Sequence, residues 1–503
     1  MREGLGHDFP YVDIVRNSTV QRVVKGTFSV LADTGVVVQD KQMQHTLAAY
    51  GCRVDTENDR VRMDEKILRR ALASAPSSFE GQAMDPSNSI RFKPGETTYF
   101  INGCGKALVD ADNWRMHDPT REEFYRHIRV IDALPNIDIQ NCFPFFGFAK
   151  VPECMRLIES AAAKFRVSSK VQIEGTLFDN YRFTSAMADL FKVDLFQIVN
   201  SAAPLTYYAE TADQMRNYTE HNLPFHFATG VTRGMTGPMT SLGSVILNNA
   251  EALAGIVMAQ ALKEGARVWV NSMMLTPNMN NGMPAFGDMG NSITDMAFNQ
   301  VWRHLGIPCW SNAAAWTSSK MIDYQAGYEL TSALVLQVLS GATAISFQGG
   351  LHDEIGVSTV KAVIDDDVVA SLKRLMRGVN DSDEGLAVDL INEVGPLPGS
   401  YLESDLTLES WRDECHIPTV GIRDTYNQWV EDGKQASVVQ RAKERLEQLI
   451  AAQPQSIITE SQEQDLEYIL NEARNHYRKK GLISDEEWHI YQEDLGSTEY
   501  PFA

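Results

Sequence analysis

The chain has 503 residues and a net charge of −21. This charge argues against nucleic acid as a partner, because binding of phosphates needs clustered Lys and Arg. No apolar run has membrane-spanning length, and Met1–Gly6 does not begin a signal peptide, so we expect no membrane partner. The six cysteines are scattered without a CxxC pair. This spacing argues against a zinc or iron–sulfur site and predicts reduced thiols in a cytoplasmic protein.

The first part of the chain predicts helices with one short strand. Helical patterns cover residues 18–34 and 41–50 and end at glycines, and a third, over 64–75, begins at Asp64 as N-cap. The run VVVQD between the first two predicts a strand. We therefore expect residues 1–130 to form an N-terminal extension of helices and a small sheet.

The segment from Pro224 to Asn271 predicts a complete β-loop-α-β unit. Two apolar runs, 225–229 and 267–271, flank a loop rich in Gly, Thr and Met and a helix over 241–263. The loop follows the carboxyl end of its strand, which is where parallel α/β folds bind ligands. The helix is apolar almost all round, so we expect it to be deeply buried.

Similar alternation from Asn136 onward predicts a (β/α)8 barrel over residues 131–405, of the usual size of ~250 residues. An open doubly wound sheet is the alternative, but no G-x-G-x-x-G follows a strand. Residues 406–503 predict a C-terminal helical extension packed on the barrel or on a neighbouring subunit. The eight expected strands are Ile137–Phe143, Val171–Glu174, Phe196–Asn200, Phe225–Thr229, Val268–Asn271, Pro308–Asn312, Ala344–Gln348 and Leu390–Val394.

Functional side chains of such a barrel lie at or just after the strand ends. The loop 99–110, with glycines at 103 and 105, is expected near the barrel mouth or else is a plain hairpin turn. The run 352–354 is either a surface loop or a polar clamp at the mouth. The strand-end residues are Phe143, Phe145, Phe146, Glu174, Asn200, His226, Phe227, Thr229, Asn271, Trp310, Asn312, Trp316, Phe347, His352, Asp353 and Glu354.

This set is rich in aromatic residues and contains neither a nucleophile–base pair nor a metal-ligand cluster. An aromatic cavity with carboxylates suits a quaternary ammonium, which attracts ring faces but cannot donate hydrogen bonds. General acid catalysis cannot act on it because it has no lone pair. Removing its methyl group requires a very strong nucleophile, and a reduced cobalt corrinoid would serve if the protein supplied orientation.

Several separate segments resemble the trimethylamine methyltransferase family, in the same order and at similar spacing. They are VLADTGVVVQD, LASAPSSFEGQAMDPSNSI, HIRVIDALPNID, GPMTSLGSVILNNAEALAGIVMAQALKEGA, PAFGDMGN and DYQAGYELTSALVLQVLSGA. The resemblance covers nearly the whole chain. It implies a TIM barrel that passes a substrate methyl group to the cobalt of a separate, small corrinoid protein. It also implies a homo-oligomer and a role in methylotrophic, methanogenic or acetogenic anaerobic metabolism.

Departures from the family pattern bear on the substrate. Trimethylamine-specific members carry pyrrolysine, whereas this chain has only the twenty standard residues and so resembles the non-pyrrolysine branch. That branch demethylates quaternary amines such as glycine betaine, proline betaine or carnitine. The segment GPLPGSYLESDLTL lacks the histidines expected there. A non-catalytic betaine-binding or regulatory barrel, or an enzyme that methylates another acceptor such as folate, remains an alternative.

A betaine carries a methylated cation at one end and a carboxylate at the other, so its site must be two-sided. No residue is assigned as acid or base, and no tightly bound metal or nucleotide is expected. Gly230, Gly234 and Gly237 are expected to leave the corrinoid a path to the methyl group. The cation-side candidates are Phe143, Glu174, Phe227, Trp310 and Phe347, and the carboxylate-side candidates are Asn200, Arg233 and His352, with Asp353 beside it.

Overall fold

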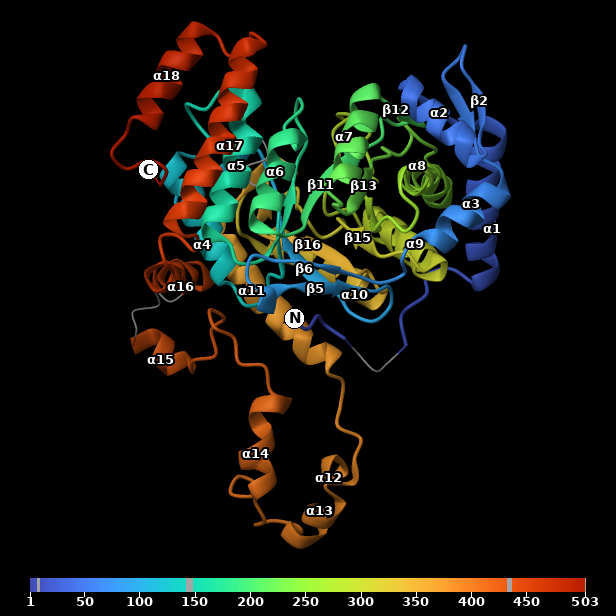
Figure 1. Cartoon of the computed structure of the whole chain (residues 1–503). Coiled ribbons are helices and arrows are strands. Elements are labelled where there is room, and N and C mark those ends of the chain that lie inside the picture. The colour runs from blue at the N-terminus through green and yellow to red at the C-terminus, as the bar shows by residue number, and fades with distance from the viewer. Residues whose placement is uncertain (7–9, 142–147, 432–436, 503) are drawn as a thin grey trace.

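A closed barrel of eight parallel strands forms the centre of the molecule (Figure 1). The computed structural model describes residues 1–6, 10–141, 148–431 and 437–502. The strands follow the barrel in the order β10-β11-β13-β14-β15-β16-β6-β9. Their bounds are β6 Tyr99–Asn102, β9 Ile139–Gln140, β10 Val171–Glu174, β11 Leu195–Asn200, β13 Phe225–Thr229, β14 Val268–Ser272, β15 Cys309–Ser311 and β16 Ala344–Gln348.

One helix follows each strand along the chain and packs outside the barrel, which makes the architecture (β/α)8. This confirms the expected fold class and excludes the open sheet. The helices are α4 Arg121–Ala133, α5 Glu153–Val167, α6 Tyr181–Phe191, α7 Ala209–Glu220, α8 Ser241–Leu262, α9 Met289–Leu305, α10 Tyr324–Leu339 and α11 Thr359–Met376.

The first barrel strand lies earlier in the chain than expected. β6 pairs with β16 and β9 and closes the barrel, although it lies within the segment 1–130. The expected strand Leu390–Val394 was wrong, because these residues belong to helix α13 (Val388–Val394), which has no buried residue. A short apolar run does not by itself distinguish a buried strand from one side of a surface helix.

The barrel interior is a packed aromatic and aliphatic core. Inward side chains of alternate strand positions include Ile173, Phe196 and Trp269. A hairpin of β4 (Phe79–Gly81) and β5 (Ile90–Phe92) adds Phe92, whose ring centroid lies 4.7 Å from that of Trp269. Together these residues fill the end of the barrel at which the strands begin, so a cavity can open only toward the strand ends beyond them.

An N-terminal cap covers one side of the barrel (Figure 1). The expected N-cap at Asp64 is confirmed, because its carboxylate accepts a hydrogen bond from Ile67 N at 3.1 Å. A four-stranded sheet joins this cap to the loop after β11. The elements are α1 Asn17–Ser29, η1 Val30–Thr34, β1 Val36–Val38, α2 Lys41–Tyr50, β2 Arg53–Asp55, β3 Arg60–Arg62, α3 Glu65–Ser74 and β12 Thr206–Tyr207, whereas η2 (Pro86–Asn88) lies in the β4–β5 hairpin.

Helix α8 is long and apolar enough to cross a membrane by length and composition alone. In this fold it is buried inside the protein, between the cap helices α1, α2 and α3, helix α9 and strand β13. Gly255 permits this close packing, because a Cβ there would lie 2.5 Å from the Phe227 ring. The expectation of a deeply buried helix is confirmed.

The C-terminal helices pack on the chain's own barrel. Helix α16 (Val438–Ala452) contacts α4 and α11, and α17 (Glu460–Lys479) contacts α5 and α6, with α18 (Asp485–Leu495) beyond it. Arg474 of α17 lies 2.9 Å from buried Glu159 of α5, and Arg121 lies 3.4 Å from the same carboxylate. Burial alone would raise the pKa of Glu159, but these two guanidinium groups hold it at about 2.

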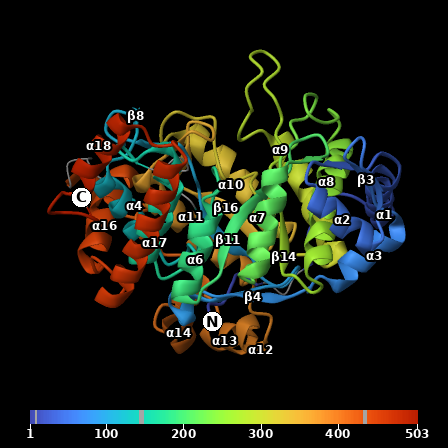
Figure 2. The ribbon, with the colours of Figure 1, turned by 45° about the horizontal axis from the view of Figure 1, so that its top comes forward.

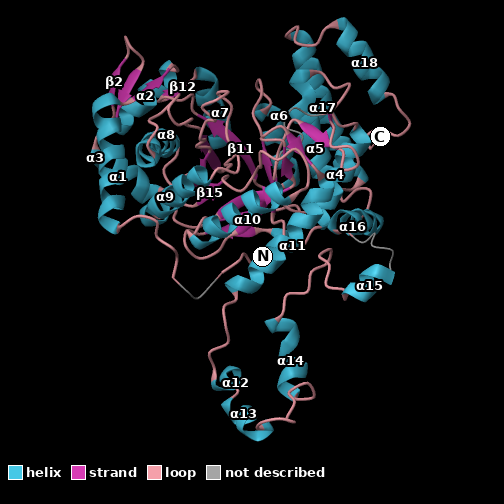
Figure 3. Ribbon diagram, turned by 180° about the vertical axis from the view of Figure 1, so that it is seen from behind, coloured by secondary structure: helices cyan, strands magenta, loops and turns pink. Residues whose placement is uncertain are grey.

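Between α11 and α16 the chain leaves the barrel and forms a projecting arm, seen below the barrel in Figure 1 and from behind in Figure 3. It carries α12 (Asp383–Leu386), α13 and α14 (Asp405–Glu414), and α15 (Tyr426–Glu431) lies on the return path.

A small sheet lies at the other end of the barrel, beside the strand ends. Its strands are β7 (Ala107–Val109), β8 (Met116–His117), β17 (Gly350–Leu351) and β18 (Gly356–Val357).

Candidate active site

A cavity of ≈ 410 Å³ opens where the barrel strands end. Its volume lies within the range of about 300–1,000 Å³ that small-molecule sites occupy. A larger groove on the arm lies far from the strand ends, so we assign the site to the barrel cavity. The cavity is lined by Cys104, Gly105, Lys106, Asn141, Ile198, Asn200, Ala228, Asn271, Met273, Trp310, Asn312, Trp316, Glu354 and Ile355.

Strand alternation decides which residues reach this cavity. Successive side chains of a strand point to opposite faces, so the last inward residues of β11, β13 and β14 are Asn200, Ala228 and Asn271. β15 contributes Trp310, and Asn312 follows it at the same spacing. The cavity wall is therefore built from rigid strand ends.

Trp310 belongs to both the cavity lining and the packed interior of the barrel. Its indole N–H donates to Ser346 Oγ at 2.9 Å. Its ring centroid lies 5.5 Å from that of Trp269 and 4.7 Å from that of His226, which points inward one strand layer below Ala228. These rings fix the orientation of Trp310, so the part of its side chain that lines the cavity forms a rigid aromatic floor.

His226 supports this floor as a neutral ring. It is fully buried, and among the residues that the structure describes neither ring nitrogen has a hydrogen-bond partner. Burial lowers the pKa of His226 to about 3, so the imidazole carries no charge near neutral pH. A cation above Trp310 would therefore meet an aromatic layer without a competing positive charge.

Two amides form the polar side of the cavity. Asn312 Nδ2 donates to Asn271 Oδ1 at 2.6 Å and to the Ser272 carbonyl at 3.1 Å. The buried Asn312 Oδ1 accepts no hydrogen bond from the described parts of the chain. Asn200 and Asn141 add two further amides to the lining. Because the Asn312–Asn271 bond fixes both side chains, the unpaired oxygen is held in place as an acceptor.

Asp295 of α9 fixes the strand ends beside these amides from outside the barrel. Its carboxylate accepts hydrogen bonds from Ser272 Oγ at 2.5 Å, Ser311 Oγ at 2.6 Å and Ala313 N at 3.1 Å. Burial outweighs these three bonds and raises the pKa of Asp295 to about 6. Its ionisation is thus linked to folding.

We expect Asp295→Asn to remove a pH dependence of stability. Because the native pKa exceeds the unfolded one, native protein retains a proton that unfolded chains release, so stability falls as pH rises from about 4 to 6. The unfolding free energy of wild type relative to Asp295→Asn should fall by about 1–1.5 kcal/mol between pH 5 and 7.5. Urea melts across this range measure it, and a difference that is constant or rises with pH would refute the assignment.

The upper part of the cavity comes from loops. The Trp316 indole N–H donates to the Cys104 carbonyl at 2.7 Å, and the Trp316 and Phe286 ring centroids lie 5.4 Å apart. Gly103 and Gly105 allow their backbone to approach residues 348–356 closely, since a Cβ on Gly105 would lie 3.0 Å from the Ile355 carbonyl. The expected position of this loop near the barrel mouth is confirmed.

The run 352–354 has two separate roles. Asp353 accepts hydrogen bonds from Ser318 Oγ at 2.6 Å and Lys320 Nζ at 2.5 Å, and His352 N donates to the Ser319 carbonyl at 3.0 Å. These bonds hold the β17–β18 hairpin to the loop after β15. Glu354, the next residue, lines the cavity, and surrounding protein raises the pKa of its carboxyl by desolvation.

Among the expected binding residues, Asn200 and Trp310 meet in the cavity. Glu174, Phe227 and Phe347 point away from it. Lys164 Nζ of α5 lies 2.8 Å from Glu174, Phe227 packs on α8, and Phe347 packs in the cluster with α10 and α11 residues. His352 and Asp353 lie beside the cavity but do not line it, and Phe143 lies outside the described residues.

The loop after β13 is held against the loop after β14. Arg233 donates to the Met239 carbonyl at 3.1 Å and to Thr276 Oγ1 at 3.0 Å, and so does not line the cavity. Gly234 adopts φ +74°, and a Cβ on Gly237 would lie 2.2 Å from Val231. Gly230, at the end of β13, lies against Met273 of the cavity wall.

Other lining residues were not expected from the sequence. Alternation along β9, β11 and β13 would have indicated Asn141, Ile198 and Ala228, whereas Lys106, Met273 and Ile355 come from loops whose path carries no sequence signal. Within the described parts of the chain, no group of three His, Cys, Asp or Glu side chains could hold a metal ion.

The fold and the cavity together define a (β/α)8 barrel with a small-molecule site at its strand ends. The family model of trimethylamine methyltransferase matches residues 2–476, so the chain belongs to this family of methyltransferases. It is 26% identical over 465 residues to glycine betaine methyltransferase of Desulfitobacterium hafniense (strain Y51), covering 89% of this chain and 94% of that protein.

Two further proteins show the range of similarity. Trimethylamine methyltransferase of Methanosarcina barkeri (strain Fusaro) is 26% identical over 383 residues, which is 73% of this chain and 77% of the relative. Among solved structures, monomethylamine methyltransferase of Methanosarcina barkeri is 10% identical, with a TM-score of 0.44 over 86% of this chain and 92% of that chain.

Proposed function

We propose that this protein removes a methyl group from a quaternary amine of the betaine type and passes it to the cobalt of a separate corrinoid protein in the cytoplasm. Membership of a methyltransferase family supports the reaction class. The observation that supports the substrate class is the aromatic floor of the cavity, formed by Trp310 over the neutral ring of His226.

A quaternary ammonium suits this floor because its positive charge is spread over methyl groups and has no hydrogen to donate. Contact with an indole face is worth roughly 0.5–2 kcal/mol, more when water is excluded. Trp316 offers a second indole, and Glu354 offers a carboxylate at the same cavity. One relative is a glycine betaine methyltransferase, and its match covers 89% of this chain, against 73% for the equally identical trimethylamine methyltransferase of Methanosarcina barkeri.

The carboxylate of a betaine requires hydrogen-bond donors at the other side of the site. Lys106 and Asn200 line the cavity and can donate to it, whereas Arg233 and His352 do not line it. Charge-assisted bonds of this kind are the strongest that an ammonium can offer. We assign the carboxylate to Lys106 and Asn200 and the cation to Trp310, Trp316 and Glu354.

The protein's share of the reaction is to bind and orient the amine. A nitrogen without a lone pair cannot be activated by protonation, so the residues need only place one methyl group toward the open mouth and exclude water. The corrinoid, when its carrier is bound, supplies a nucleophile strong enough to accept that methyl group. The rigid strand ends favour such positioning over proton transfer.

The rim of the cavity suits a protein acceptor. Exposed methionines follow β13, β14 and β15 at this end of the barrel, including Met235 (63% exposed), Met279 (78%) and Met321 (41%). The loop between β14 and α9 projects from the same end (Figure 2). Methionine side chains are flexible and apolar and are common where a surface must adapt to a partner.

The test combines the purified protein, reduced cobalamin and one amine at a time: glycine betaine, proline betaine, carnitine or trimethylamine. Methylcobalt absorbance and mass spectrometry of the demethylated amine should both report transfer from a betaine. Faster turnover of trimethylamine would refute the substrate class. Methylation of folate in place of cobalamin would refute the corrinoid as methyl acceptor. Binding of the amine without transfer to either acceptor would also refute it.

We expect Lys106→Met to weaken binding of carboxylated amines selectively. Because Lys106 is exposed, the loss should be about threefold to tenfold in Kd for the best betaine. Tetramethylammonium, which has no carboxylate, should bind equally to variant and wild type in isothermal titration calorimetry. Lys320→Met is the matched control, since Lys320 pairs with Asp353 outside the cavity. An equal loss for both ligands would remove Lys106 from the carboxylate site.

A further inference from the structure

Asp295 of α9 is a buried carboxylate without a cationic partner. It is 2% exposed, and in the described parts of the chain no Lys, Arg or His forms a salt bridge with it. Other buried acids, such as Glu159, Glu174 and Asp365, each pair with a Lys or Arg. A buried charge without a partner is unfavourable, so the charged form of Asp295 is stabilised by any positive charge that comes close to it.

Asp295 lies directly behind the wall of the barrel cavity. Its carboxylate accepts hydrogen bonds from Ser272 Oγ at 2.5 Å and Ser311 Oγ at 2.6 Å, and both serines point outward from their strands. The neighbouring residues Asn271 and Asn312 point inward and line the cavity. The backbone N–H of Asn312 also donates to the carboxylate. One backbone layer therefore separates Asp295 from the cavity.

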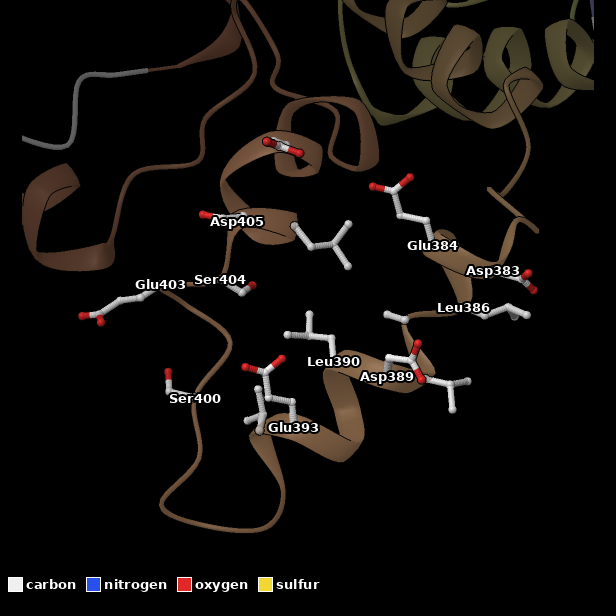
Figure 4. Close-up of a pocket in the computed structure, with 15 residues that line it drawn as sticks. Asp383, Glu384, Leu386, Asp389, Leu390, Glu393, Ser400, Glu403, Ser404 and Asp405 are labelled. Carbon is white, nitrogen blue, oxygen red and sulfur yellow. The ribbon is translucent and has the colours of Figure 1, made fainter.

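The hydrogen bonds to this carboxylate come from neutral groups. Hydroxyl and backbone dipoles stabilise its charge only in part, because burial outweighs them and raises the pKa of Asp295. The acidic residues of the arm provide a contrast, since they line a groove of ≈ 860 Å³ but are exposed, and water stabilises their charge (Figure 4). Asp295 is shielded from water, so a cation in the adjoining cavity would stabilise it instead.

The titratable side chains around Asp295 do not supply this cation. Those with a positive charge are exposed or bind other groups, as Arg233 binds the Met239 carbonyl and Thr276 Oγ1. The Cys309 thiol is neutral, because burial raises its pKa to about 12. The titratable side chains on the elements packed against α9, on α9 itself and in the cavity are Arg22, Lys25, Cys104, Lys106, Arg233, Glu251, Asp288, Arg303, His304, Cys309, Glu329 and Glu354.

We propose that Asp295 is a distant counter-ion of the bound quaternary ammonium, which supplies the positive charge that the surrounding protein lacks. This inference rests on the proposed function, because it requires a cationic substrate. Trp310 and Glu354 face the cation from within the cavity, whereas Asp295 acts on it across the wall that Asn312 forms. The consequence is a preference for a methylated cation over a neutral molecule of the same shape.

Binding of the cation should release a proton from Asp295 to the buffer. At an effective dielectric constant of about 20, a charge about 10 Å away makes a carboxylic acid about tenfold stronger. With a pKa of about 6 in the empty protein, Asp295 is half protonated at pH 6, and binding then releases about 0.4 proton per cation. Because the charged carboxylate favours the cation, affinity should rise about fivefold from pH 5 to pH 8.

Isothermal titration calorimetry in buffers of different ionisation enthalpy measures this proton. The two ligands are choline and dimethylbutanol, the alcohol in which a carbon atom replaces the charged nitrogen of choline. Neither ligand titrates between pH 5 and pH 8. Choline should release a proton near pH 6 and none at pH 8, whereas the alcohol should release none at either pH.

Two variants separate the carboxylates that a cation can influence. Asp295→Asn should release about 0.3 proton fewer than wild type at pH 6, whereas Glu354→Gln should retain this share of the release. Asp295→Asn should also lose at least threefold in its preference for choline over the alcohol. This preference is a ratio measured on one variant, so a general loss of structure affects both ligands and cancels.

The outcomes distinguish this inference from the proposed function. If wild type binds choline at pH 6 without releasing a proton, or if Asp295→Asn releases as much as wild type, Asp295 is not the counter-ion. Loss of the whole release in Glu354→Gln would overturn it as well, and this variant keeps the test valid if Asp295→Asn does not fold. If neither choline nor any betaine binds to wild type, the proposed function fails instead.

Discussion

Replacing Trp310 with alanine should raise the Kd for a quaternary amine at least tenfold and reduce methyl transfer to a similar or greater extent. The variant loses the aromatic floor, whose cation contact is worth roughly 0.5–2 kcal/mol, and opens the cavity to water. It should also lose about 3–5 kcal/mol of stability, since a large buried side chain is truncated. Calorimetric binding below the melting temperature separates the two effects.

Trp310→Phe and Trp302→Phe form a matched pair. Each replacement removes a buried indole N–H that donates a hydrogen bond. The Trp310 N–H donates to Ser346 Oγ at 2.9 Å, and the Trp302 N–H donates to Asn249 Oδ1 at 2.8 Å. Trp302 lies on α9 outside the barrel, so only the Trp310 variant should lose ligand affinity while both lose similar stability. If both variants bind the amine like wild type, the cation does not rest on Trp310.

Replacing Lys164 with methionine should cost about 3–5 kcal/mol of folding stability, because it leaves the buried Glu174 carboxylate without a cationic partner. Both side chains of this pair are 0% exposed, and burial already raises the pKa of Glu174 despite the neighbouring ammonium. The Lys164→Met/Glu174→Gln double variant should recover more than half of the loss. Chemical denaturation of the four proteins of this cycle measures the coupling.

This cycle also decides between two roles for Glu174. The structure pairs it with a helix outside the barrel, whereas strand-end position alone makes it a substrate ligand. If Glu174→Gln abolishes ligand binding while Lys164→Met leaves stability unchanged, the carboxylate contacts the substrate and the ion pair is wrong. We expect instead that Glu174→Gln still binds the ligand and that Lys164→Met loses stability.

Much of the fold could be predicted from the sequence because a parallel barrel repeats one strong local signal. Seven expected strands, including 225–229 and 344–348, correspond to barrel strands. The eighth was misplaced because β6 lies in the segment that was assigned to the N-terminal extension, whereas 390–394 is an apolar run that lies on an exposed helix. Exposure of the arm could not be inferred, since it depends on tertiary contacts that the local pattern does not record.

The site was predicted less well for a reason of register. Both faces of a barrel strand are buried, so hydrophobicity does not reveal which residues point inward, and a shift of one residue exchanges the two faces. Phe227 and Phe347 were favoured as aromatic residues, yet the inward neighbours are Ala228 and Ser346. Trp310 and Asn200 do line the cavity, because their side chains point to the inside of the barrel, and their role as substrate ligands stays a prediction.

The aromatic hairpin that fills the far end of the barrel has a kinetic consequence for the proposed reaction. With Phe79 and Phe92 packed against the strand beginnings, the amine must enter and its product must leave through the same opening that the methyl acceptor has to cover. Loading, transfer and unloading then follow a compulsory order in which the acceptor docks after the substrate and departs before the product. An excess of acceptor protein bound to the empty enzyme would block entry of the amine and inhibit the reaction. The rate of turnover then depends on the rate at which the acceptor protein dissociates.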